Sequence, residues 1–346
     1  MSHRPILIWG AGAIGGTVGA YLQRAGDAVQ FVDRAADHVA AIAKDGLQIT
    51  GPIEEFRVKA SASTPGDLEG RFDTVFLCTK APDTAGAVEV LAPFVTDDGC
   101  VVSLQNGLNE QAIAAKLGEN RTIGAFINFG ADYMSPGMVH YAGRGAVVIG
   151  ELDGKTTPRV ENLHRLLKKF EERALLTANI WGFLWSKLAY GALLFATALT
   201  NDSIADCLAS PRHRGLLIAL AREVEGVAVS SGVRLESFDG FDPTAFLPQA
   251  STADAAASLD ALVAFNRRSA KTHSGIWRDL AVRKRKTEVD AQLGPVAKAG
   301  AARKIPTPLT TRLIELIHDI EEGRRPLDWA TLDALATAFP ARGSAA

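Results

Sequence analysis

The sequence has few cysteines and no excess of charge of either sign. Its 346 residues include three cysteines, without the paired spacing of a metal site or a disulfide framework. Lys and Arg number 37 against 39 Asp and Glu. The densest basic run, Arg283–Lys286, is too short to suggest a nucleic-acid-binding surface. We therefore predict no metal site and no nucleic-acid partner.

The sequence also lacks a long apolar run and a leader pattern. No run reaches the roughly 20 residues needed to span a bilayer, and Leu188–Leu199 is better interpreted as a buried helix. No apolar segment with a small-residue cleavage site follows Met1. We therefore expect no membrane partner and a cytoplasmic location. The length favours two domains.

The first half of the chain alternates between short apolar runs and helix-length stretches. This alternation predicts an α/β fold, in which a parallel sheet is covered by helices on both faces. The expected strands are Ile6–Trp9, Ala28–Val32, Thr74–Cys78, Cys100–Leu104, Thr122–Phe126 and Ala146–Ile149. The expected helices between them include Gly16–Arg24, Asp37–Asp45 and Thr84–Leu91.

The second half is predicted to be helical, because apolar residues recur there at three- and four-residue spacing. Its expected helices are Leu184–Leu199, His213–Ser230, Ser258–Arg268, Thr287–Ala299 and Thr307–Glu321. We predict an N-terminal Rossmann-type domain over residues 1–178, an all-helical domain over 179–336 and a frayed tail over 337–346. Segment 238–268 looks extended, and two interpretations stay open, a lid or a surface insertion. The apolar helical surface is compatible with a homodimer.

A glycine-rich turn follows the first predicted strand and opens a helix. Gly10, Gly12 and Gly15, with Ala13 and Ile14 between them, fit the G-x-G-x-x-G pattern. In this pattern the glycines permit a tight turn, close approach of a pyrophosphate and close packing of helix on strand. We therefore predict a dinucleotide site, with phosphate at the helix N-terminus.

Two side chains at the end of the second strand favour different cofactors. Asp33 lies where an acid accepts a hydrogen bond from the ribose 2′-hydroxyl, which favours NAD. Arg34 can pair with a 2′-phosphate, which favours NADP. The sequence does not decide which of the two side chains faces the cofactor.

A Rossmann-type domain followed by a helical domain suggests a hydride-transfer enzyme with its site in the cleft between the domains. Polar residues that follow later strands and occupy two helix starts are the candidates for that site. Lys80 and Asn106 come after the third and fourth strands, where ligands of parallel sheets bind. Lys187 opens the first helix of the second domain, and Glu288 opens a later one. A charged lysine at an apolar helix start is costly unless it is paired or faces a cleft.

These motifs together resemble the ketopantoate reductase (2-dehydropantoate 2-reductase) family. The matching segments follow the family's order over about residues 5–300. They are the glycine-rich turn, Thr79-Lys80, Gln105-Asn106-Gly107-Leu108, Trp185-Ser186-Lys187-Leu188-Ala189, His273-Ser274 and Arg285-Lys286-Thr287-Glu288-Val289-Asp290.

The resemblance implies a reductase that transfers a hydride from a nicotinamide cofactor to C2 of a 2-oxo acid. Lys187 then matches the proton donor to the C2 oxygen, and Glu288 matches the acid that pairs with this lysine and the substrate hydroxyl. Ser274 matches a serine that binds the substrate carboxylate. Asn106 and Lys80 match residues that line the cleft.

The resemblance also favours NADP, because Arg34 matches the position often used for the 2′-phosphate. Simpler interpretations of the matched residues remain. Ser274 could cap a helix, and Lys80 could be a surface charge.

The sequence departs from the family at two positions of the predicted substrate pocket. Polar residues are expected one and two turns after Lys187, but Gly191 and Phe195 stand there. The pocket is therefore expected to be larger and less polar. Two alternatives follow: the same chemistry on another, less polar oxo or hydroxy acid, and a regulator that senses the dinucleotide without turnover.

Overall fold

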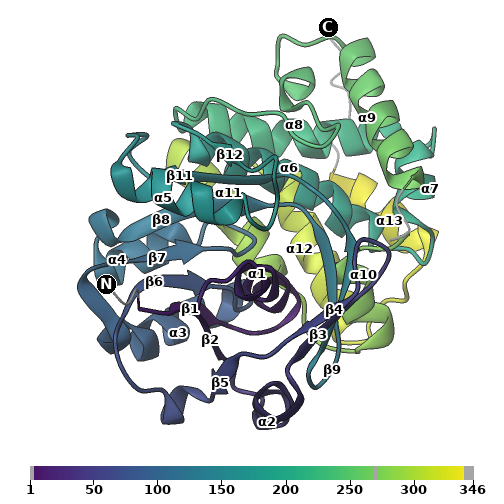
Figure 1. Ribbon diagram of the computed structural model, residues 1–346. Helices are drawn as coiled ribbons and strands as arrows, with labels where there is room; N and C mark the ends of the chain where they lie inside the picture. Colours follow the sequence, from purple (N-terminus) through teal and green to yellow (C-terminus); the bar gives the residue numbers. More distant parts are fainter. Residues whose placement is uncertain (1–3, 269–271, 339–346) are drawn as a thin grey trace, which may run out of the picture. The chain divides into compact units, whose positions relative to one another are not determined.

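The structure, a computed structural model, describes residues 4–268 and 272–338. The chain forms two compact units, Met1–Ile180 and Trp181–Ala346 (Figure 1). The boundary between the units follows Ile180, two residues after the boundary that the sequence analysis placed between 178 and 179. Residues 339–346 of the predicted frayed tail lie outside the described residues.

A mainly parallel sheet forms the framework of the first unit. Its order, β12-β11-β8-β7-β6-β1-β2-β5, contains the doubly wound arrangement in which the strand order reverses between β1 and β6. Strand β11 runs antiparallel to β8. The strands are β1 (Ile6–Trp9), β2 (Val29–Val32), β5 (Ser61–Ser63), β6 (Phe72–Leu77), β7 (Val95–Ser103), β8 (Thr122–Ile127), β11 (Val147–Glu151) and β12 (Leu175–Leu176).

Both faces of this sheet are buried, which explains why its central strands are continuous apolar runs. Successive residues of β1 enter opposite cores: Ile8 packs in one, and Leu7 and Trp9 pack in the other. Helices α1 (Ala13–Arg24) and α5 (Pro158–Leu167) contribute to the first core. Helices α3 (Thr84–Leu91) and α4 (Glu110–Leu117) contribute to the second. The predicted parallel sheet with two covered faces is confirmed.

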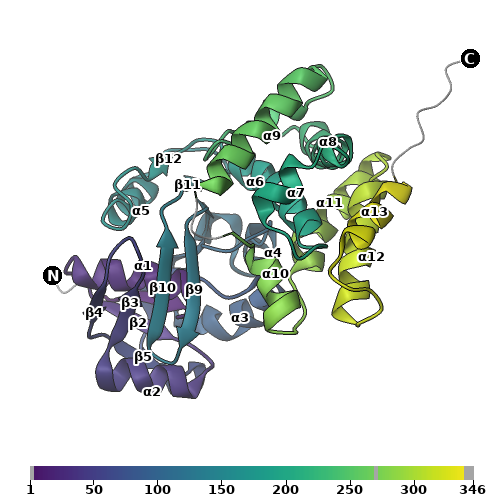
Figure 2. The same ribbon diagram turned by 90° about the vertical axis from the view of Figure 1, so that its right-hand side faces the viewer.

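A second, smaller sheet in the first unit was missed by the sequence analysis. It has the order β4-β3-β10-β9, and its strands are β3 (Leu47–Thr50), β4 (Phe56–Val58), β9 (Gly130–Ser135) and β10 (Met138–Gly143). Figure 2 shows β9 and β10 side by side. Helix α1 contacts strands of both sheets, and α2 (Ala36–Asp45) leads into β3. These strands are short and half polar, so their pattern is weak in the sequence.

The second unit is helical, as predicted. Its helices are α6 (Ile180–Thr197), which begins at the last residue of the first unit, α7 (Ile204–Ala209), α8 (Arg214–Ser230), α9 (Thr252–Arg267), α10 (Gly275–Trp277), α11 (Val289–Arg303), α12 (Pro308–Glu321) and α13 (Trp329–Leu335). Among the described residues, no helix combines the length and apolar character needed to cross a membrane.

Lys187 does not open its helix, contrary to the sequence interpretation. Helix α6 begins at Ile180, so Lys187 lies in its interior, two turns from the start. The error arose because the apolar residues before Trp185 lack a helix-start signal, and the helix extends back through them.

Segment 238–268 is largely helical rather than extended. Ser251 caps α9 in a capping box with Asp254. Leu259 and Leu262 of α9 are fully buried, and α9 packs against α7 and α8. The Ser/Thr/Ala-rich stretch is therefore a helix packed within the second unit, not a surface insertion.

Two helical glycines test how tightly the first unit is packed. A Cβ on Gly19 of α1 would overlap the Phe31 ring and lie 2.9 Å from Ile8 Cγ1, whereas a Cβ on Gly86 of α3 has no atom within 4 Å. We expect Gly19→Ala to lower the free energy of unfolding by about 1–3 kcal/mol. Gly86→Ala, the matched control, should leave it unchanged or raise it by up to about 1 kcal/mol. Urea unfolding measures both, and equal effects would contradict this packing.

Candidate active site

The glycine-rich turn lies at the carboxyl end of β1, where the strand order reverses. Gly10 has φ +101°, a conformation that favours glycine, and a Cβ there would lie 2.9 Å from the backbone of Cys78 and Thr79. At Gly12 a Cβ would have no atom within 4 Å. The backbone is therefore bare at Gly12, which is what close approach of a pyrophosphate requires.

Helix α1 begins directly after this turn, at Ala13 and Ile14. Its N-cap residue is Gly12, so no side chain caps the N–H groups of the first turn. These groups have no acceptor within the helix and lie at the positive end of its dipole. A Cβ on Gly15 would overlap the Gly10 carbonyl oxygen, so this position needs glycine. The turn thus fits the phosphates of a dinucleotide.

Asp33 holds the glycine-rich turn in place. Its Oδ2 accepts a hydrogen bond from Ala11 N at 2.9 Å, and its Oδ1 accepts one from Ala35 N at 3.0 Å. Each carboxylate oxygen has a second lone pair available for a ribose hydroxyl. Asp33 therefore combines the predicted position of a ribose acceptor with a structural contact that the sequence analysis did not foresee.

Arg34 extends into solvent beside Asp33. Its side chain is 83% exposed, and its Nη1 lies 3.5 Å from Asp83 Oδ1. An exposed ion pair of this kind contributes little to stability, so the guanidinium can turn toward a phosphate at low cost. Side chains suited to NAD and to NADP are therefore both in place.

His38 was missed by the sequence analysis, yet it supports the same turn. It is buried, and its Nδ1 accepts a hydrogen bond from Gly137 N at 2.9 Å. The ring therefore carries its hydrogen on Nε2, which donates to the Ala11 carbonyl oxygen at 2.9 Å. Gly137 joins β9 to β10, so the second sheet holds the glycine-rich turn through this histidine.

The loops after β6 and β7 are joined by buried side-chain amides. Gln105 Nε2 donates to the Thr79 carbonyl oxygen at 2.9 Å, and Asn109 Nδ2 donates to the Asn106 carbonyl oxygen at 2.7 Å. Lys80 and Asn106 themselves are exposed. Their backbones are therefore held at the carboxyl edge of the sheet, and their side chains remain accessible.

In the second unit, Lys187 lies on the one accessible stripe of a buried helix. Between Gly182 and Thr197 of α6, the partly exposed residues are Lys187, Gly191 and Leu194. Their spacing places them on one helix face. The remaining α6 residues in that stretch are buried and apolar or small, so Lys187 brings the only charge to this face.

The protonation of Lys187 is balanced between burial and nearby carboxylates. Burial lowers the pKa of Lys187 to about 8, while the negative charges of Glu288 and Asp239 act to raise it. The ammonium form thus dominates at neutral pH, and the neutral form is reached about one pH unit higher. Such a pKa suits a group that exchanges a proton near neutral pH.

Glu288 stands immediately before α11, as predicted. It is the N-cap residue, but its side chain makes no capping hydrogen bond. Its charge acts on Lys187. The structure therefore brings the two predicted catalytic residues into one electrostatic cluster.

Asp239 is a third member of this cluster that the sequence analysis missed. It has φ +41° in a tight Asp239-Gly240 turn, closed by Phe238 N donating to the Phe241 carbonyl oxygen at 3.0 Å. A left-handed conformation at a non-glycine residue is costly and is maintained only by its surroundings. Here Tyr190 of α6 packs against both phenylalanines, with ring centroids 6.0 and 5.8 Å apart. The available sequence signal was the Asp-Gly turn between two aromatic residues.

Ser274 caps a short helix. Its Oγ accepts a hydrogen bond from Trp277 N at 3.1 Å, and the residue is buried. Ser274 therefore caps a helix, as the simpler interpretation expected, and its binding of a substrate carboxylate stays a prediction. A π-helix over Arg278–Val282 lies between Ser274 and Glu288.

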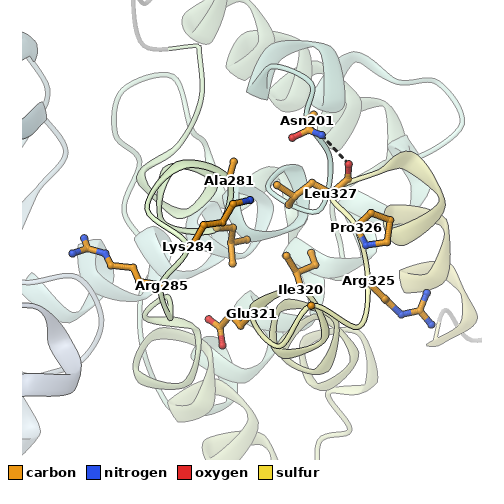
Figure 3. Close-up of a pocket in the computed structure, with 11 residues that line it drawn as sticks. Asn201, Ala281, Lys284, Arg285, Ile320, Glu321, Arg325, Pro326 and Leu327 are labelled. Carbon is orange, nitrogen blue, oxygen red and sulfur yellow. Dashed lines mark hydrogen bonds between the residues drawn. The ribbon is translucent and has the colours of Figure 1, made fainter.

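The basic run has a structural explanation. Arg283 and Arg285 both bond the buried Asp279 carboxylate, at 3.1 and 2.9 Å. The run also borders a cavity of about 490 Å³, and Figure 3 shows the Arg285 and Arg325 side chains extending away from its centre. Lys187 and Glu288 do not line this cavity.

The two departures from the expected pocket pattern have different environments. Gly191 is partly exposed on the same stripe as Lys187. Phe195 is 0% exposed. The prediction that Phe195 lines the substrate pocket is therefore wrong in this structure, because the helix rotates this side chain into the core.

Two family models match the chain. The model of ketopantoate reductase PanE/ApbA matches residues 6–154, and the model of its C-terminal part matches residues 179–321. The chain belongs to the ketopantoate reductase family. It is 29% identical over 325 residues to the 2-dehydropantoate 2-reductase of Archaeoglobus fulgidus, covering 93% of this chain and 100% of the relative. It is 32% identical over 243 residues to that of Pyrococcus horikoshii, covering 67% and 75%.

Solved structures agree with the fold. A PanE/ApbA family ketopantoate reductase from Ralstonia eutropha JMP134 has a TM-score of 0.78 at 27% identity and covers 92% of this chain and 99% of its own. A D-mandelate dehydrogenase solved with NADH and anilino(oxo)acetate has the same TM-score of 0.78 at 23% identity, again covering 92% and 99%. At that identity it is evidence for the fold alone.

The family confirms the predicted enzyme class, an NAD(P)-dependent oxidoreductase acting on C=O and CH–OH groups. The family and the Rossmann-type fold of the first unit both indicate a nicotinamide dinucleotide as the cofactor. The roles of individual residues, Lys187 and Glu288 among them, stay predictions.

The lowered pKa of Lys187 has a consequence for stability. Between about pH 8 and 10.5 the unfolded chain binds a proton at Lys187 that the folded chain does not, so folding gains stability as pH rises through this range. We expect wild type to gain about 2–3 kcal/mol relative to Lys187→Met between pH 7 and pH 10. Urea unfolding at both pH values measures this difference. Lys298→Met, at an exposed position of α11, is the control, and an equal pH response in both variants would contradict the lowered pKa of Lys187.

Proposed function

We propose that this protein reduces the carbonyl group of a 2-oxo acid with NADPH, and that Lys187 donates the proton. The observation that carries the proposal is the position of Lys187, partly exposed on the accessible stripe of α6 with a pKa of about 8 and acted on by the carboxylates of Glu288 and Asp239. Carbonyl reduction needs such an acid, because the developing alkoxide must be protonated. The dinucleotide-binding turn of the first unit supports the same reaction class.

The chain's own residues supply the proton that the reduction requires. The bound cofactor supplies a hydride to the carbonyl carbon, and the proton comes from Nζ of Lys187 to the carbonyl oxygen. Glu288 and Asp239 keep Lys187 charged before the transfer, because their charges raise its pKa. The same ammonium stabilises negative charge on the oxygen as it develops.

The leading substrate is 2-dehydropantoate, which the names of the curated relatives specify. A different oxo or hydroxy acid is favoured by one observation, the absence of a side chain at Gly191 on the Lys187 face of α6. A larger substituent can occupy that position. The class of reaction is unchanged by this alternative.

The exposed Arg34 supports NADP over NAD. A guanidinium binds a 2′-phosphate through charge-assisted hydrogen bonds, whereas Asp33 is already engaged with Ala11 and Ala35. The proposed preference is therefore NADPH, with NADH as the weaker cofactor.

The first test removes the proton donor. We expect wild type to oxidise NADPH in the presence of 2-dehydropantoate, and Lys187→Ala to lower kcat by about 10²–10⁴-fold. NADPH binding, measured by fluorescence, should be retained. Binding of NADPH without turnover of any oxo acid, in wild type, would contradict the proposal and favour the dinucleotide-sensing regulator.

The pH profile tests the same residue without removing it. Reduction requires protonated Lys187, so kcat/KM should fall above a pKa of about 8, by tenfold per pH unit. Glu288→Gln removes a charge that raises this pKa, so the falling limb should move to lower pH. If the falling limb stays at the same pH in this variant, the charge of Glu288 does not act on the pKa of Lys187.

The nucleotide preference is tested at Arg34. We expect Arg34→Ala to raise KM for NADPH by about 10–100-fold and KM for NADH by less than about twofold. Lys59→Ala, at another exposed cation of the first unit, is the control and should change neither value. Equal losses for the two nucleotides would show that Arg34 does not contact the 2′-phosphate.

A further inference from the structure

The second unit contains a cavity that the proposed reaction does not use. It is lined by residues of the π-helix and the loop that follows it, by the end of α12 with the turn after it, and by Asn201. Neither Lys187 nor Glu288 lines it. Its volume of about 490 Å³ is within the range of roughly 300–1,000 Å³ that is usual for small-molecule sites. A small molecule can therefore occupy it.

Much of the cavity lining is apolar. The apolar residues come from the π-helix, from α12 and from the turn after α12, and they are Leu280, Ala281, Ile320, Pro326 and Leu327. A ligand gains free energy from such a lining only by burying apolar surface of its own. The occupant therefore needs an apolar body.

Two polar groups of the lining are already engaged within the protein. Asn201 Nδ2 donates a hydrogen bond to the Leu327 carbonyl oxygen at 3.0 Å. The Glu321 carboxylate accepts a hydrogen bond from Thr287 N at 2.7 Å and bonds His318 Nδ1 at 2.9 Å. The Glu321 side chain is only 2% exposed. These two groups therefore hold the walls of the cavity together and offer little to a ligand.

The two arginines of the lining are also paired. Arg285 bonds Asp279 at 2.9 Å, and Arg325 bonds Asp319 at 3.2 Å. Figure 3 shows both guanidinium groups extending away from the centre of the cavity. Arg283 bonds the same Asp279 carboxylate at 3.1 Å, so one negative charge serves two guanidinium groups. The loop therefore gives the border of the cavity an excess of positive charge.

Lys284 differs from both arginines, because its ammonium group has no partner among the residues that the structure describes. Figure 3 shows its side chain directed toward the cavity. Its backbone is fixed on both sides, since N of Arg283 and N of Arg285 donate to carbonyl oxygens of the π-helix at 2.8 and 3.0 Å. An ammonium group held in this way can bind a negative charge without first breaking an ion pair.

We propose that this cavity is a second ligand site of the protein, which binds a small carboxylate with an apolar body. The carboxylate pairs with Lys284, and the apolar body covers Ile320 and Leu327. A carboxylate fits better than a phosphate ester, because a phosphate dianion needs several donors and Lys284 is the one unpaired cation in the described lining. The inference does not depend on the proposed function, since neither proposed catalytic residue lines the cavity.

Calorimetry tests the site with three carboxylates that differ in their apolar body, namely cyclohexanecarboxylate, octanoate and 2-naphthoate. We expect wild type to bind at least one of them with a Kd of about 1 mM or lower. Lys284→Met should weaken that carboxylate by about 10–100-fold. The corresponding carboxamide should bind wild type more weakly by a similar factor, and Lys284→Met should not weaken it further.

Lys304→Met is the matched control for this variant. Lys304 is exposed, has a left-handed backbone conformation like that of Lys284, with φ +59° against +49°, and does not line the cavity. This variant should bind the carboxylate as wild type does. Ala281→Leu narrows the cavity without changing its charge, so it should also weaken binding. Thermal unfolding of each variant without ligand shows whether it folds.

The proposed proton donor separates this cavity from the proposed active site. Lys187→Met should leave carboxylate binding unchanged, because Lys187 does not line the cavity. A loss of binding in Lys187→Met rather than in Lys284→Met would overturn the inference and leave the proposed function intact. The inference also fails if wild type binds none of the three carboxylates, or if wild type and Lys284→Met bind them equally.

Discussion

The second unit is organised around one constraint, the charge of Lys187 within an apolar helix. A lone ammonium in this position would lose its proton or destabilise the fold, because burial disfavours the charged form. Two carboxylates from separate parts of the chain offset that cost. Glu288 comes from the start of α11, and Asp239 comes from a turn whose strained backbone is held by Tyr190 and two phenylalanines. The resulting pKa near 8 gives the lysine a proton that it can hold and release near neutral pH.

The first unit satisfies a different requirement, a glycine-rich turn whose backbone is left uncovered. The backbone nitrogen of Ala11 donates a hydrogen bond to Asp33, and the carbonyl oxygen of Ala11 accepts one from His38. Both contacts use Ala11, so Gly12 and the first N–H groups of α1 remain uncovered. The small second sheet therefore supports the glycine-rich turn, because Gly137 bonds His38, which in turn bonds Ala11.

Charge and open space beside Lys187 come from different residues of the second unit. The carboxylates of Glu288 and Asp239 act on the protonation of Lys187. One turn after Lys187 on α6 is Gly191, and the uncharged Gln292 of α11 lies opposite it.

The sequence by itself determined the parallel sheet, the helical second half, the glycine-rich turn and the chemical candidates Lys187 and Glu288. These features depend on local patterns, such as apolar periodicity, a fixed glycine spacing and charges at apolar positions. Tertiary structure alone decided the second sheet, the support of Ala11 by His38 and the burial of Phe195. It also decided that Asp239 acts on Lys187 and that Gln292 lies opposite Gly191. These contacts join residues far apart in the chain, and no local pattern encodes which distant side chains will meet.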